Sequence, residues 1–130
     1  MALVQILPVV SLIGMVALVV SATFTDLMKS RAFLWFWVVY AVGFGAFSLF
    51  AIAEDGLVSF WTNHTANWIG NQVWADLVFA LAIGWILVLP EARRRDMNIW
   101  FWLIVVLGTA TVGFAAMIAR LLYLRAQDTA

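Results

Sequence analysis

The chain contains no cysteine, a single histidine and little charge. Without cysteine it can form no disulfide, thiolate metal site, iron–sulfur cluster or cysteine nucleophile. One histidine, His64, cannot supply both ligands of a bis-histidine haem from one copy of the chain. Charged residues make up 11% of the sequence, against about 25% in soluble domains. Because the net charge is zero, no basic surface is expected for nucleic acid.

Apolar residues account for 66% of the 130 residues, and the mean hydropathy is +1.04. A membrane-spanning helix needs roughly 20 apolar residues, and four segments meet this length: residues 3–24, 32–53, 68–89 and 99–119. The first run is longer than the apolar core of a signal peptide, about 7–15 residues, so it is predicted to be retained. The sequence therefore predicts one all-α domain over residues 1–130, an integral membrane four-helix bundle.

The segments between these spans hold most of the charge, and their basic residues predict the orientation. Lys29, Arg31 and the triplet Arg93, Arg94 and Arg95 lie in the first and third joints, whereas the other side would carry only Arg120 and Arg125. Cytoplasmic loops are enriched in Lys and Arg, so five against two predicts both termini on the non-cytoplasmic side. The triplet is interpreted as a cytoplasmic anchor, with an anionic-lipid or partner contact as the alternative. Pro90 is expected to end the third helix.

The positions of the eight tryptophans, and of the segment between the second and third spans, agree with the same orientation. Five tryptophans fall near the predicted cytoplasmic ends of the spans and three near the outer ends: Trp35, Trp37, Trp85, Trp100 and Trp102, then Trp61, Trp68 and Trp74. This is typical of interfacial aromatic belts, although stacking on a pigment or quinone is the alternative. The apolar stretch "LVSFW" predicts a short helix at the outer surface. His64 follows it and is interpreted as a loop histidine rather than a metal or chlorophyll ligand.

Asp76 is the one carboxylate within an apolar span, and no basic residue is near it in sequence. A carboxylate on the lipid face costs about 2.5–3.5 kcal/mol at a helix centre, so Asp76 is predicted to face the bundle. Ser48, Thr111 and Arg120 lie at a comparable predicted depth and would complete a buried polar cluster with Asp76. The cluster is interpreted as structural, with a ligand or partner contact next and proton or ion translocation last, because no titratable group continues the path through the inner half.

Three stretches carry a resemblance to a known family: "WADLVFALAIGW", "PEARRRDM" and "GTATVGFAAMIARLLYLR". Over residues 68–125 the chain resembles a family of uncharacterised bacterial membrane proteins, grouped as a domain of unknown function. The resemblance implies four helices, an acidic residue at the opening of the third span (here Asp76) and a Leu-Tyr-Leu-Arg ending of the fourth (here residues 122–125). It implies no activity, and it favours a bacterial inner membrane.

With no recognisable nucleophile, metal cluster or phosphate loop, the chain is predicted to be non-catalytic, an accessory or structural subunit of a larger membrane complex. Its expected partners are the lipid bilayer and other membrane subunits. The alternative is a binder or carrier of a small hydrophobic ligand, such as a quinone, carotenoid or lipid, held in the bundle by Asp76 and Arg120. A transporter would need a continuous polar path, and an enzyme would need a base paired with its carboxylates. No cofactor is specified by the sequence.

Overall fold

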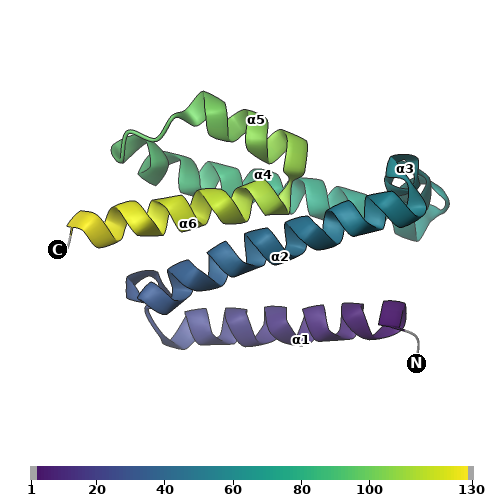
Figure 1. The fold of residues 1–130 in the computed structure, drawn as a ribbon, viewed down its shortest axis with the longest axis horizontal. Coiled ribbons are helices and arrows are strands. Elements are labelled where there is room, and N and C mark those ends of the chain that lie inside the picture. Colours follow the sequence, from purple (N-terminus) through teal and green to yellow (C-terminus); the bar gives the residue numbers. More distant parts are fainter. Residues whose placement is uncertain (1–2, 129–130) are drawn as a thin grey trace.

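The computed structural model describes residues 3–128, which form helices and no strand. Residues 3–128 form six α-helices and one short 3-10 turn, and Figure 1 shows how the helices are arranged. In chain order these are α1 (Leu3–Phe24), η1 (Leu27–Lys29), α2 (Arg31–Asp55), α3 (Leu57–Thr65), α4 (Trp68–Arg94), α5 (Ile99–Thr109) and α6 (Thr111–Asp128). The all-α prediction is confirmed, but the chain has six helices where four were expected.

Three helices, α1, α2 and α4, are long and apolar enough to cross a membrane. They correspond to the first three predicted spans, and the predicted short helix of the second joint is present as α3. The prediction that Pro90 ends the third helix is wrong, because α4 continues to Arg94. A proline inside a helix removes one backbone hydrogen bond. Here the turn after Pro90 is held by side-chain bonds from Arg95 and Arg125 to Glu91.

The predicted fourth span is wrong, because the chain breaks at Ala110 into α5 and α6. Ala110 has φ 50° and ψ −120°, a conformation outside the helical region. At 1.5 Å per residue, the 11 residues of α5 reach only about 16 Å, half the thickness of a bilayer core. From Ala110 the chain returns as α6 along the direction from which α5 came (Figure 1). The two helices therefore form a hairpin that enters and leaves at one end of the molecule.

Small residues allow this hairpin to close tightly. A Cβ atom on Gly113 would stand 2.8 Å from both Val105 Cγ1 and the Val105 carbonyl oxygen, so α6 touches α5 at its first turn. Gly45 on α2 and Gly84 on α4 receive the side chains of Val112 and Phe114 in the same way. The turn at Ala110 thus lies between α2 and α4, near the middle of each.

The buried core lies in one half of the molecule. It consists of Ala92, Met97, Val106, Met117 and Leu121. These come from the end of α4, from the loop after it (Met97), from α5 and from α6. By contrast, α1 has no buried side chain over residues 4–24, and only Leu18 is half-buried. The chain therefore has a compact hairpin core and long helices whose apolar surfaces it does not cover itself.

The two ends of the described chain lie at opposite ends of the long axis (Figure 1). Asp128 and Arg125 of α6 form ion pairs with Arg95 and Glu91 at the end of α4, whereas Leu3 begins α1 at the other end. In a four-span scheme the two ends would lie together, whereas the reversal at Ala110 adds a change of direction and places them apart. The side of a membrane on which each terminus lies stays a prediction.

Candidate functional site

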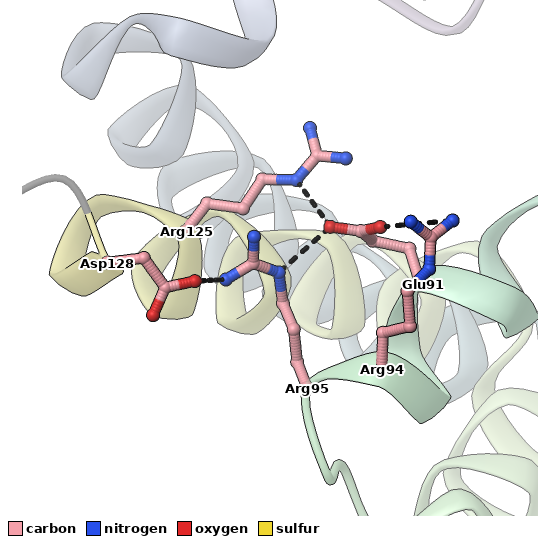
Figure 2. A network of polar contacts seen from close by, with 5 residues as sticks. All are labelled: Glu91, Arg94, Arg95, Arg125 and Asp128. Carbon is pink, nitrogen blue, oxygen red and sulfur yellow. Dashed lines mark hydrogen bonds and ion pairs between the residues drawn. The ribbon is translucent and has the colours of Figure 1, made fainter.

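Glu91 is the centre of a network of charged side chains at the end where α4 and α6 finish (Figure 2). Its Oε1 atom accepts a hydrogen bond from Arg95 Nε at 2.9 Å and another from Arg125 Nε at 3.1 Å. Arg94 Nη2 lies 3.7 Å from the other carboxylate oxygen. Arg95 also donates through Nη1 to Asp128. One carboxylate thus joins α4, the loop after it and α6.

The spacing of residues within α4 accounts for the pairing of Glu91 with Arg95. Glu91 and Arg95 are four residues apart, a spacing that brings two side chains to the same face of a helix. The side chains of Glu91 and Arg95 are 19% and 20% exposed, so water screens their pairing less than at an open surface. The pKa of the Arg95 guanidinium is raised because it donates hydrogen bonds to Glu91 and Asp128.

This network is suited to holding helices together, because the Glu91 carboxylate already accepts hydrogen bonds from two arginines. Within residues 3–128, no three side chains of His, Asp and Glu gather closely enough to hold a metal ion. What the arrangement does is hold the far end of the hairpin against α4. It is a structural clamp at the polar end of a largely apolar fold.

All the predicted anchors lie at this same end. Lys29 pairs with Asp26 at 2.8 Å in η1, Arg31 begins α2, and Arg93, Arg94 and Arg95 end α4. The Lys29 ammonium lowers the pKa of Asp26, mainly through its hydrogen bond to that carboxylate. Because α6 returns to this end, Arg125 joins them, and every Lys and Arg of the chain now belongs to one half of the fold. We call this the basic end.

Sequence reasoning missed three members of the network: Glu91, Arg125 and Asp128. The spacing of Glu91 and Arg95 was a visible signal for one ion pair. The contacts of Arg125 and Asp128 could not be expected, because a straight fourth span would have carried both residues to the opposite side.

Asp76 lies in the other half of α4, where the structure shows it exposed. Its Oδ2 atom accepts a hydrogen bond from Gln72 Nε2 at 2.6 Å, one helical turn earlier. In the described part of the chain no contact joins Asp76 to Ser48, Thr111 or Arg120. The single chain does not assemble the four residues into a cluster.

The other three residues have local roles. Ser48 donates to the Phe44 carbonyl at 2.7 Å within its own helix, and Thr111 is half-buried at the start of α6. The Arg120 guanidinium lies over the ring of Tyr123 at 5.4 Å, within cation–π range. Arg120 stands nine residues after Thr111, so α6 carries it about 13 Å toward the basic end and away from Asp76.

The end opposite the basic end is capped by α3. His64 Nδ1 donates to the Phe60 carbonyl at 2.6 Å, and its ring lies 5.2 Å from that of Trp74 on α4. A Cβ atom on Gly70 would stand 2.9 Å from the carbonyl oxygens of Asn63 and His64, so α3 and α4 are in close contact. His64 here closes an aromatic cluster at the end of a helix.

Comparison with known proteins gives a family and no activity. The family described as "Protein of unknown function DUF2834" matches residues 44–127, which run from the middle of α2 almost to the end of α6. No curated protein and no solved structure matches the chain.

Proposed function

The chain belongs to the DUF2834 family, whose function is unknown, and we propose that it is a non-catalytic integral membrane subunit that packs against another protein. One observation carries the proposal: Asp76 and Gln72 form a hydrogen-bonded pair on an exposed face of an apolar spanning helix. A carboxylate exposed to lipid at this position is costly, about 2.5–3.5 kcal/mol at a helix centre.

Within residues 3–128, no side chain of another helix pairs with this carboxylate. Arg120 lies on the half of α6 nearer the basic end. The Ser48 hydroxyl donates to the Phe44 carbonyl oxygen of its own helix. Polar residues of spanning helices normally face protein or a water-filled cavity. The surface that covers Asp76 therefore belongs to a second polypeptide, which presents a donor such as Arg, Ser or Thr at the same depth. The uncovered apolar surface of α1 is a further area for subunit or lipid contact.

A photoreactive amino acid placed at Ala80 tests this in native membranes. Ala80 lies one turn from Asp76 on the same stripe and is exposed, whereas Val78 lies on another face of α4 and is the matched control. We expect a protein adduct from Ala80, lipid adducts from Val78, and loss of the protein adduct in Asp76→Leu but not in Asp76→Asn. Lipid adducts alone at both positions would overturn the proposal. A small-molecule adduct at Ala80 would support the alternative, a carrier of a quinone, carotenoid or lipid.

We further propose that the basic end faces the cytoplasm, in a bacterial inner membrane as the family resemblance favours. All seven Lys and Arg residues lie at this end, which is the bias expected of cytoplasmic segments. Cysteines at Ser30 and Gln127 should then both be protected from an impermeant thiol reagent in intact cells, and a cysteine at His64 should react. Opposite labelling of Ser30 and Gln127 would contradict the hairpin, and labelling of both with protection of His64 would reverse the orientation.

A further inference from the structure

Two shallow hollows with apolar lining meet at the basic end of α2. The first is a hollow of about 280 Å³ between the start of α2 and the end of α6, lined by Arg31, Leu34, Trp35, Tyr123, Ala126 and Gln127. The second is a shallow apolar groove on the surface of α2, lined by Trp35, Phe36, Val39 and Tyr40. Trp35 belongs to both, so the hollow beside Arg31 continues into this groove.

The hollow between α2 and α6 has two cations beside it without acidic partners. In the described part of the chain no carboxylate pairs with Arg31 or Arg120. Arg31 lines the hollow directly, and Arg120 lies over the ring of Tyr123, which forms the opposite wall. Both arginine side chains are exposed. In contrast, Arg95 and Arg125 at the same end are occupied by Glu91.

Hydrogen bonding prepares the same wall for an anion. Gln127 Nε2 donates to the Tyr123 hydroxyl oxygen at 2.8 Å, which leaves the hydroxyl hydrogen free to be donated elsewhere. Arg120, Tyr123 and Gln127 follow at spacings of three and four residues and so share one face of α6. Arg31 approaches from α2. Guanidinium groups are suited to bidentate binding of phosphate oxygens.

We propose that an anionic phospholipid binds here, with its phosphate between Arg31, Arg120 and Tyr123 and an acyl chain in the groove past Trp35 and Val39. An anionic phospholipid complements both features of this surface. Its phosphate carries the negative charge that the two arginines lack from any carboxylate of the described chain. Its acyl chain would cover the adjoining apolar side chains, which are exposed (Trp35 63%, Val39 69%). Arginines at the ends of spanning segments reach toward the headgroup layer, where anionic lipids supply that charge. This inference rests on the basic end lying at a membrane surface, as proposed above.

The test uses the full chain in a mild detergent and two lipids with identical chains, dioleoylphosphatidylglycerol and dioleoylphosphatidylcholine. Native mass spectrometry measures how much of each lipid remains bound. A basic side chain at an anionic surface contributes about 1 kcal/mol, a factor of about five in affinity. Arg31→Gln should thus weaken phosphatidylglycerol binding about fivefold, and Arg31→Gln with Arg120→Gln about 25-fold, with phosphatidylcholine unchanged. Trp35→Ala should weaken both lipids, because it removes the wall shared by hollow and groove.

Arg93→Gln is the matched control, since Arg93 is an exposed arginine at the basic end that does not line the hollow. It should change phosphatidylglycerol binding by less than about twofold. Equal binding of the two lipids by the wild type, or an equal loss from Arg93→Gln and Arg31→Gln, would overturn the site. A measurement without substitution guards against misfolding: brominated phosphatidylglycerol should quench tryptophan fluorescence at lower concentration than brominated phosphatidylcholine. If brominated phosphatidylglycerol quenches at the lower concentration but the cysteine labelling contradicts the proposed orientation, the lipid site is supported and the orientation is wrong.

Discussion

Replacing Ala110 by glycine distinguishes the hairpin from a straight fourth span by the sign of one stability change. Ala110 has φ 50° and ψ −120° between α5 and α6. A left-handed backbone costs an L-residue about 1–2 kcal/mol, because Cβ approaches the neighbouring carbonyl, and glycine avoids this cost. The greater freedom of glycine in the unfolded chain offsets about 0.4–1 kcal/mol of the gain. Ala110→Gly should therefore stabilise the hairpin by about 0.5–1 kcal/mol.

A straight helix through residue 110 gives the opposite result. Alanine is the best helix former, and glycine in a helix interior costs about 1 kcal/mol. The two topologies thus differ by about 1.5–2 kcal/mol in the expected effect of one substitution. Because the sign differs, the test does not depend on a precise magnitude.

The free energy of unfolding is measured by titrating denaturing detergent into protein in mild-detergent micelles, with the intrinsic tryptophan fluorescence as the signal. Ala82→Gly is the matched control: Ala82 is exposed in the interior of α4, so this substitution should destabilise the protein by about 1 kcal/mol in either topology. A loss of stability in Ala110→Gly equal to that in Ala82→Gly would refute the hairpin.

Three further substitutions examine the contacts that hold the fold. Glu91→Gln removes the negative charge of the group that accepts hydrogen bonds from Arg95 and Arg125, and it should lower the free energy of unfolding by about 1–2 kcal/mol. Asp26→Asn, in an exposed pair, should leave the unfolding midpoint unchanged, and equal effects of the two would contradict the clamp. Gly113→Ala should disrupt the hairpin, because its Cβ would meet the Val105 carbonyl oxygen at 2.8 Å, and it should lower the unfolding midpoint well below that of Gly14→Ala, which meets nothing within 4 Å. Gly70→Ala should separate α3 from α4 and speed proteolysis of the segment between them; an unchanged cleavage rate would exclude a tight cap.

Composition and run length were sufficient to predict the all-α class and three of the helices. The runs that became α1, α2 and α4 are continuous and at least as long as a bilayer core requires. The amphipathic "LVSFW" stretch was enough to predict α3. These elements depend on local sequence alone, so no knowledge of distant contacts was needed.

The break at Ala110 was not predicted, because the residue at the break gives no signal for one. Alanine between two threonines continues a helix readily. The reversal is stabilised by contacts between distant residues: Gly113 against α5, Val112 against Gly45, and Arg125 against Glu91. The predicted depth of Arg120 depended on a straight span and failed with it. A missed hint was the change from the wholly apolar residues 99–108 to a segment with Arg120, Arg125 and Gln127.

The reversal at Ala110 also changes which groups could neutralise the charges of Asp76 and Arg120. In a straight four-span bundle they were expected at similar depth, where each could neutralise the other. In the hairpin, Asp76 lies in the first half of α4 and Arg120 lies on the return toward the basic end. Neither charge can then be satisfied by the other, and an unpaired charge in apolar surroundings is unfavourable. Because the two environments differ, we propose different partners for the two charges: a protein donor for Asp76 within the membrane, and a lipid phosphate for Arg120 near its surface.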